Sequence, residues 1–323
     1  MPDLRHHTVQ VPATSANLGP GYDSYGLALT LHLAVRTRPR EAQPTRVIAR
    51  GEGAGDVGAG DDNLIWRAFV HLCDSVEVPV PDVGLEAVNR IPLERGLGSS
   101  SAAIVAGLTL ARAVTGVPVG DRDLVRSATE IEGHPDNVAP ALLGGLVVCA
   151  RDDTGELVTR RVNPAARLRP IVLVPPTRQS TSAARAVLPE QLPVEEVTVQ
   201  ASRAGHVLGA LTGVWPADPR VVGDRLHEPA RTAVMGTSMA LVGELREAGL
   251  HAWLSGAGPT VAVATERGQA GEPMVARCSE LARVHGFAVH LVDFDLSGAL
   301  TCPDDGCGLA GSGGCAQCPR ERL

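Results

Sequence analysis

The spacing of apolar residues changes along the chain between the two-residue period of strands and the longer period of helices. Residues 83–91 alternate apolar and polar side chains and predict a half-buried strand. The run of Ala, Leu and Val that continues to about residue 114 predicts a helix. Further strands are predicted at residues 8–12, 24–38 and 46–50, and further helices at residues 63–75 and 121–131.

The second half of the chain continues this mixture and ends in a segment of different composition. Strands are predicted at residues 156–162, 170–174, 251–254, 260–264 and 287–293, and helices at about 194–212, 238–248 and 274–285. Because a chain of 323 residues is longer than one typical domain, we expect an α+β protein of two domains. We place them at residues 1–160 and 161–300, followed by a flexible tail at residues 301–323.

The composition indicates a soluble globular protein that handles small molecules. Hydrophobic residues make up 44% of the chain and charged residues 20%, and no apolar run approaches the roughly 18 residues of a membrane span. Residues 1–7 lack the apolar core of a signal peptide, so we expect a cytoplasmic protein. A net charge of −7 and an aromatic content of 2% are unlike a nucleic-acid-binding protein. We therefore expect no nucleic-acid or membrane partner, and the sequence leaves the oligomeric state, including a homodimer, open.

The chain contains no lysine, so every basic side chain other than histidine is an arginine. This excludes the lysine of a Walker A loop, the strand lysine of protein kinases and a Schiff-base lysine. If the protein binds the phosphates of ATP, then backbone amides, arginines and a metal ion must neutralise their charge.

Four of the seven cysteines crowd into the tail with the spacing C-x4-C-x7-C-x2-C, and these are Cys302, Cys307, Cys315 and Cys318. Such a set could hold a zinc ion, but the gaps match no common zinc module and the Gly-rich surroundings favour a flexible tail. The other three stand in apolar surroundings and are expected to be buried thiols, namely Cys73, Cys149 and Cys278.

The segment at residues 92–103, P-L-E-R-G-L-G-S-S-S-A-A, joins the predicted strand at 83–91 to the helix that follows. Gly96 and Gly98 permit backbone conformations that a side chain would block, and the three serines are good residues for starting a helix. A loop of N–H groups that ends on a helix N-terminus binds anions such as phosphate. The alternative is an ordinary turn in which the serines only cap the helix.

A second polar segment lies at residues 13–23, A-T-S-A-N-L-G-P-G-Y-D. Its Gly-Pro-Gly sequence forces a bend that lets the backbone approach a ligand closely. Asn17 and Asp23 bracket the bend. The alternative for these two residues is an Asx-type turn, in which each side chain bonds nearby backbone.

A third polar segment lies at residues 130–145, E-I-E-G-H-P-D-N-V-A-P-A-L-L-G-G. Glu130 and Glu132 are two positions apart on a helix, so only one of them should point inward. Gly133 and Pro135 break that helix, which favours an exposed site for the polar groups around His134.

Together these segments resemble the GHMP kinase family. The phosphate loop of that family reads P-x3-G-L-G-S-S-x-A, and residues 92–102 match it in full. The family's Gly-rich turn near the C-terminus is matched by residues 254–260, L-S-G-A-G-P-T. Four segments are similar to the corresponding segments of the family members that phosphorylate L-homoserine, namely residues 12–23, 132–145, 180–185 and 227–231. The resemblance covers residues 8 to about 296 and leaves out the cysteine tail.

The resemblance implies two α+β domains with the nucleotide in the cleft between them. It implies a phosphotransferase that moves the γ-phosphate of ATP to the side-chain hydroxyl of L-homoserine, giving O-phospho-L-homoserine for threonine biosynthesis. The nucleotide-binding residues it implies are Pro92, Arg95, Gly96, Leu97, Gly98, Ser99, Ser100, Ser101, Ala102, Gly256 and Gly258. The implied ligands of Mg²⁺ are Ser100 and Glu130, with Glu132 as the alternative because the helix phase alone does not choose between them.

For the acceptor, the resemblance implies that Arg185 and Arg231 hold a carboxylate as planar cationic forks. Asp23 would hold the ammonium group. Further polar contacts are implied for Asn17, His134 and Thr181. Without the resemblance, an arginine on a helix face would more commonly be solvated.

The residue that would accept the proton of the hydroxyl differs from that of a related kinase. The related mevalonate kinases carry an aspartate seven residues before their Gly-Gly pair, and the same count from Gly144 reaches Asn137. Because an amide cannot remove a proton, we expect the hydroxyl to attack the γ-phosphate directly, with its proton leaving to a phosphate oxygen or to water. Asp136 is the alternative base.

Two other functions fit parts of this pattern. One is a related small-molecule kinase whose acceptor also bears a carboxylate. The other is a ligand-binding relative without catalysis, which we would expect to lack the Mg²⁺ ligands or the complete glycine loop.

Overall fold

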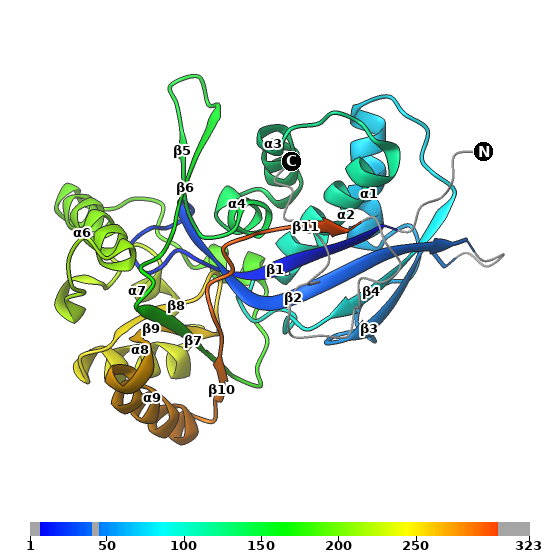
Figure 1. Cartoon of the computed structure of the whole chain (residues 1–323). Helices are drawn as coiled ribbons and strands as arrows, with labels where there is room; N and C mark the ends of the chain where they lie inside the picture. The colour runs from blue at the N-terminus through cyan, green and yellow to red at the C-terminus, as the bar shows by residue number, and fades with distance from the viewer. Residues whose placement is uncertain (1–6, 41–44, 303–323) are drawn as a thin grey trace.

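Two sheets with helices packed on them make up the computed structural model, which describes residues 7–40 and 45–302 (Figure 1). Within these residues the first sheet has seven strands in the order β11-β1-β2-β4-β3, with β5 paired to β2 and β6 paired to β5. The strands are β1 (Thr8–Ala16), β2 (Tyr25–Pro39), β3 (Val47–Gly51), β4 (Val83–Asn89), β5 (Leu146–Arg151), β6 (Leu157–Val162) and β11 (Leu300–Cys302). Their pairings are antiparallel except for the parallel pairing of β3 with β4.

The helices of the first half gather beside β1, as Figure 1 shows. They are α1 (Leu64–Ser75), α2 (Ser99–Thr115), α3 (Asp121–Glu132) and α4 (Pro135–Leu143). Helices α2 and α4 contact β1, and α1 packs on α2. Buried apolar side chains such as Val11, Phe69 and Leu108 form one core between these helices and the sheet. This core fixes the N-terminal ends of α2 and α4 relative to the end of β1.

The second sheet has the order β10-β7-β9-β8, and all its pairings are antiparallel. Its strands are β7 (Leu168–Val174), β8 (His251–Leu254), β9 (Val261–Glu266) and β10 (Ala288–Leu291). The helices of this half are α5 (Thr181–Ala186), α6 (Val194–Thr212), α7 (Glu228–Arg231), α8 (Gly236–Glu247) and α9 (Glu272–His285), with short 3₁₀ turns at η1 (Pro219–Val221) and η2 (Gly268–Gly271). A second core that includes Ile171, Leu241 and Leu281 lies between this sheet and the helices α8 and α9.

The predicted α+β fold is confirmed, and most predicted elements are present close to their predicted positions. The predicted strand at 83–91 is β4, and the predicted helix that ends near residue 114 is α2. We propose that the two sheets form the cores of two domains. The chain passes from one sheet to the other between β6 and β7, close to residue 160, and β11 returns the last described residues to the first sheet.

The sequence pattern missed some short elements. The sequence pattern predicts no helix at residues 135–143, but these residues form α4. Proline at the first position of a helix costs no hydrogen bond, so Pro135 starts α4 after it has ended the predicted helix at 121–131. The three-residue strand β11 was also missed, because its position depends on pairing with β1 and on no local pattern.

The cysteines of the described chain are free and buried, as predicted for Cys73, Cys149 and Cys278. Burial raises the pKa of the Cys149 and Cys278 thiols to about 12. Cys302 lies in β11, whereas the other cysteines of the predicted tail, Cys307, Cys315 and Cys318, fall outside the described residues. None of the described helices is long and apolar enough to cross a membrane.

Gly107 brings α2 close to α1. A Cβ atom added at Gly107 would lie 2.3 Å from the carbonyl oxygen of Ile65 and 2.8 Å from Cβ of Ala68. We expect Gly107→Ala to lower the free energy of unfolding by about 1–3 kcal/mol through overpacking, although alanine is the better helix former.

Gly205 in α6 is the matched control, because an added Cβ there meets no atom within 4 Å. We expect Gly205→Ala to raise the free energy of unfolding by roughly 0.5–1 kcal/mol. Urea denaturation of both variants measures the difference. The close helix packing would be contradicted if Gly107→Ala were as stable as Gly205→Ala.

Candidate active site

The loop before α2 is built on glycines with left-handed backbone conformations. Gly96 has φ 70° and Gly98, the N-cap of α2, has φ 64°. A Cβ atom at Gly96 would lie 2.2 Å from the carbonyl oxygen of Ser255, and one at Gly98 would lie 1.9 Å from Oγ1 of Thr14. Both positions therefore require glycine for conformation and for space.

The first turn of α2 presents its amides at the end of this loop. No side chain caps the helix, and the first α-helical hydrogen bond runs from the N–H of Ala102 to the carbonyl of Gly98. The N–H groups of Ser99, Ser100 and Ser101 precede that bond and sit at the positive end of the helix dipole. This arrangement is suited to an anion, which is the ligand that the sequence predicts here.

The Gly-rich turn after β8 docks on this loop and on the end of β1. The hydroxyl of Ser255 donates to the carbonyl of Gly96 at 2.6 Å, and the N–H of Gly256 donates to the carbonyl of Ala16 at 3.1 Å. Gly256 is close enough to Gly96 that an added Cβ would lie 3.3 Å from the carbonyl oxygen of Gly96. The turn therefore joins the two halves of the chain beside the phosphate loop, while Gly258 faces Met235.

The carboxylate that reaches the loop is Glu132, and the predicted pair of Ser100 with Glu130 is not formed. Oε1 of Glu132 accepts hydrogen bonds from the hydroxyls of Ser100 at 2.6 Å and Ser101 at 2.8 Å. Glu130 is exposed. Two positions on an α-helix differ by about 200° around its axis, so the two side chains diverge. The alternative that the sequence left open is thus the one that the geometry favours.

Asn137 and Asp136 lie in the first turn of α4, next to the phosphate loop. Oδ1 of Asn137 accepts a hydrogen bond from the hydroxyl of Thr14 at 2.7 Å and would lie 3.1 Å from a Cβ atom at Gly98. Asp136 is only 2% exposed, and its Oδ1 lies 2.6 Å from Nδ1 of His134. Burial disfavours a charged His134, but the hydrogen bond and negative charge of Asp136 outweigh it and raise the pKa of His134.

Arg185 and Asp23, predicted to bind opposite ends of the acceptor, bind each other. Nη2 of Arg185 lies 2.7 Å from Oδ1 of Asp23, and Nη1 lies 3.0 Å from Oδ2. Nη1 also donates to the hydroxyl of Tyr22 at 2.8 Å. Both members of the pair are about one-third exposed, at 36% and 33%, so a charged ligand can reach them.

Arg231 is buried and has no acidic partner. It is 2% exposed, and no carboxylate of the described residues lies within ion-pairing distance of its guanidinium. Its Nη1 contacts the carbonyl of Gly256 at 2.8 Å and Nδ1 of His227 at 3.1 Å, and its Nε donates to the carbonyl of Ala184 at 3.3 Å. Burial lowers the pKa of Arg231 and outweighs the opposing charges of Asp224 and Asp23. A buried cation of this kind is suited to an anionic ligand.

Tyr22 is the site residue that the sequence reasoning missed. The guanidinium carbons of Arg185 and Arg231 lie 5.6 Å and 5.9 Å from the centre of its ring. Burial, followed by the charge of Asp23, raises the pKa of its hydroxyl. Its position beside Asp23 in a bend predicted to approach a ligand was the available signal.

Three other predicted residues have different surroundings from those expected. Asn17 is held by backbone, because its Nδ2 donates to the carbonyl of Gly256 and its Oδ1 accepts from the N–H of Asp23. The Asx-type alternative is not the arrangement found either, because Oδ1 of Asn17 accepts from an N–H six residues along the chain and the carboxylate of Asp23 bonds Arg185. Arg95 donates to the backbone carbonyls of Leu93, Pro175 and Pro176 and is held away from the first turn of α2. Thr181 begins α5 and is exposed.

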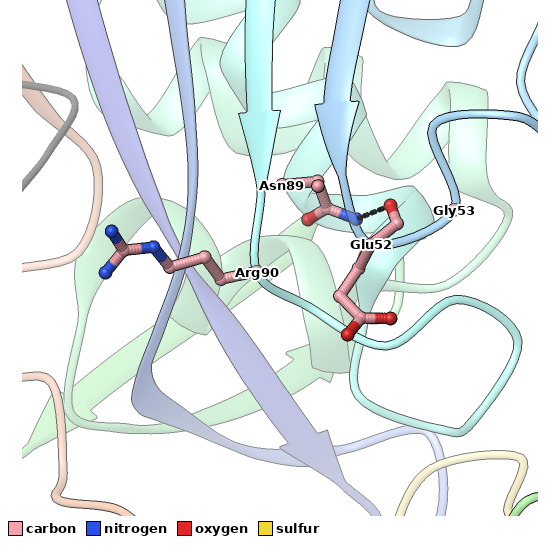
Figure 2. A pocket seen from close by; sticks show the side chains of 5 residues that line it. Glu52, Gly53, Asn89 and Arg90 are labelled. Atoms are coloured by element: carbon pink, nitrogen blue, oxygen red, sulfur yellow. Dashed lines mark hydrogen bonds between the residues drawn. The ribbon is translucent and has the colours of Figure 1, made fainter.

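A shallow hollow of about 400 Å³ lies where the phosphate loop leaves β4 (Figure 2). It is lined by Gly51, Glu52, Gly53, Asn89 and Arg90. Figure 2 shows the amide of Asn89 turned to the backbone of Glu52, to which it donates a hydrogen bond of 3.0 Å. Gly53, in the lining of this hollow, packs against Leu93, because an added Cβ at Gly53 would lie 1.9 Å from Cδ1 of Leu93.

Known proteins share both the sequence pattern and the fold. Residues 63–145, which include the phosphate loop and Asn137, match the family described as GHMP kinases N terminal domain. The chain is 43% identical to a homoserine kinase of Clavibacter michiganensis over 80% of this chain and 82% of that protein. It is 40% identical to a homoserine kinase of Streptomyces avermitilis over 91% of this chain and 95% of that protein. The crystal structure of a homoserine kinase from Cytophaga hutchinsonii has the same fold, with a TM-score of 0.79 and 23% identity over 92% of this chain and 98% of that chain.

We expect Asp136→Asn to lower the pKa of His134, because the carboxylate charge is removed while the opposing burial remains. In the unchanged protein, the pair stabilises the folded state fully below the ordinary histidine pKa of 6.5. That stability is lost as the pH rises through the raised pKa of the folded state. NMR titration of the His134 imidazole measures the change in its pKa. The control is Glu130→Gln, which changes an exposed residue. A His134 pKa that stays raised in Asp136→Asn would disprove this pairing.

Proposed function

This chain belongs to the homoserine kinase family, and on that premise we propose that it transfers the γ-phosphoryl group of ATP to the side-chain hydroxyl of L-homoserine. The observation that carries this substrate is Arg231, a buried guanidinium that forms no ion pair with any carboxylate in residues 7–40 or 45–302. It bonds the carbonyl of Gly256, and Gly256 lies against Gly96 of the phosphate loop. Arg231 and the phosphate loop thus contact the same turn, which supports an acceptor whose carboxylate binds Arg231.

The phosphate loop and the adjoining hollow support ATP as the phosphoryl donor. We place the triphosphate on the amides at the N-terminus of α2, where the helix dipole favours negative charge. The hollow lined by Asn89 and Arg90 opens at the start of the same loop and would receive the adenosine end. In a chain without lysine, backbone N–H groups carry most of the phosphate recognition.

The residues at the end of α3 fit a magnesium ion. Mg²⁺ prefers hard oxygen ligands and retains several waters, so one hydroxyl and one carboxylate suffice. The Ser100 hydroxyl and the Glu132 carboxylate meet at the first turn of α2. When bound, the ion would neutralise charge on the transferring phosphate.

The acceptor would bind by exchanging partners with the Arg185–Asp23 pair. L-homoserine carries a carboxylate and an ammonium group, which are the charges that Arg185 and Asp23 supply to each other. We propose that the acceptor carboxylate joins Arg231 and Arg185, and that Asp23 takes the ammonium group. This exchange keeps each charge paired.

Direct attack of the hydroxyl remains our proposed mechanism. Asn137 stands where a basic aspartate would be needed, and its amide oxygen is bonded to Thr14. Asp136, the alternative base, is paired with His134. Phosphoryl transfer through a loose transition state needs positioning and charge stabilisation more than a strong base.

We expect Glu132→Ala to lower kcat on the order of 10²-fold or more and to raise the Mg²⁺ concentration needed for half-maximal rate. The reason is the contact of Glu132 with Ser100. The matched control is Glu130→Ala, which should stay within about twofold of the unchanged enzyme because Glu130 is exposed. ADP formation at varied Mg²⁺ measures both, and the opposite ranking of the two variants would refute the role of Glu132.

We also expect ADP formation with L-homoserine to exceed that with L-serine and mevalonate. The sharpest comparison is 3-aminopropan-1-ol, which keeps the hydroxyl and amine of L-homoserine but lacks the carboxylate. Its kcat/KM should be lower by about 10³-fold or more, because Arg231 would stay buried and unpaired. Equal use of 3-aminopropan-1-ol, or no ADP with L-homoserine, would refute the proposed acceptor.

A further inference from the structure

His227 is a fully buried histidine between the acceptor-site arginine and the bend at residues 17–23. Its ring is 0% exposed. Nε2 lies 2.9 Å from the carbonyl oxygen of Gly19, and Nδ1 lies 3.1 Å from Nη1 of Arg231. The ring centre lies 5.4 Å from that of Tyr22. One imidazole thus touches both segments that flank the acceptor.

The two neighbours of the imidazole determine its tautomer. A carbonyl oxygen can only accept a hydrogen bond, so Nε2 of His227 must carry the proton toward Gly19. A guanidinium can only donate, so Nδ1 must present its lone pair to Arg231. An imidazolium would have to turn an N–H toward the guanidinium and would lose this bond.

The surrounding charges are consistent with a neutral ring. Desolvation is the main cause that lowers the pKa of His227, and it outweighs the opposing charges of Asp224 and Glu228. Glu228 is already paired with Arg246, and Oδ2 of Asp224 accepts the backbone N–H groups at the start of α7. Oδ1 of Asp224 is 3.7 Å from Nε2 of His227, beyond hydrogen-bond distance.

The contacts of Arg231 leave one edge of its guanidinium for a ligand. A guanidinium has five N–H donors. Nε is used by Ala184, and Nη1 by Gly256 and His227, whereas Nη2 has no acceptor among the described residues. His227 supplies the only one of these three acceptors that is a side chain, so it is the one that substitution can remove.

We propose that neutral His227 is a positioning residue for the phosphoryl acceptor, which holds Arg231 with Nη2 free for the acceptor carboxylate and ties it to the bend that carries Tyr22 and Asp23. This inference rests on the proposed function. We expect His227 to affect binding of the acceptor and not the chemical step, because His227 contacts neither the phosphate loop nor Glu132.

Two conservative variants test the two ring nitrogens separately. The amide of asparagine can replace Nδ1 as the acceptor for Arg231, whereas the amide of glutamine can replace Nε2 as the donor to Gly19. We expect His227→Gln to raise KM for L-homoserine by about 10-fold or more, because a bond to a charged group is lost. We expect His227→Asn to raise it by less than about 5-fold, with kcat and KM for ATP of both variants within about 2-fold of the unchanged enzyme.

His251 provides the control for general loss of stability. It is also buried, at 3% exposed, but it packs against Trp253 and has no contact with Arg231. We expect His251→Asn to lower the melting temperature without a selective change in KM for L-homoserine. The inference is overturned if both His227 variants keep the KM for L-homoserine of the unchanged enzyme, or if His251→Asn raises that KM as much as His227→Gln does. If the unchanged enzyme forms no ADP with L-homoserine, the proposed function fails instead.

Discussion

The contact between the Gly-rich turn after β8 and the phosphate loop is the constraint on which the rest of the site depends. It is a contact of backbone with backbone, made possible because Gly96 and Gly256 lack side chains. The carbonyl of Gly256 accepts hydrogen bonds from both Asn17 and Arg231. One peptide therefore fixes the bend after β1, Arg231 and the edge of the phosphate loop relative to one another. Because phosphoryl transfer depends mainly on positioning, this shared reference point is what the chemistry requires.

The arginines of this lysine-free chain serve different electrostatic purposes. Arg246 is neutralised by a bidentate bond to Glu228 and stabilises the packing around α7. Arg95 bonds backbone carbonyls and holds the segment that leads to α5. Arg185 is paired with Asp23 near the surface, where the pair can exchange partners with a zwitterion. Arg231 is deeply buried and forms no ion pair with a carboxylate of the described residues, which suits it to an anion from outside the chain.

The sequence predicted the fold and the composition of the site, but not all the pairings within it. The periodicity of apolar residues predicted β4 and α2. The glycines between them indicated the phosphate loop, because left-handed backbone and close packing of main chains both favour glycine. The choice between Glu130 and Glu132 was not accessible in this way, since both lie in the last turn of α3 and its exact rotation is set by packing on α2. The partners of Arg95 could not be predicted from the sequence either, because Pro175 and Pro176 are about 80 residues away along the chain.

The most direct test of this account is a crystal structure with L-homoserine and a non-hydrolysable ATP analogue. The account predicts that the acceptor carboxylate accepts a hydrogen bond from Nη2 of Arg231 and that the triphosphate lies on the amides at the start of α2. A carboxylate bound elsewhere, with Arg231 still lacking an anionic partner, would contradict it.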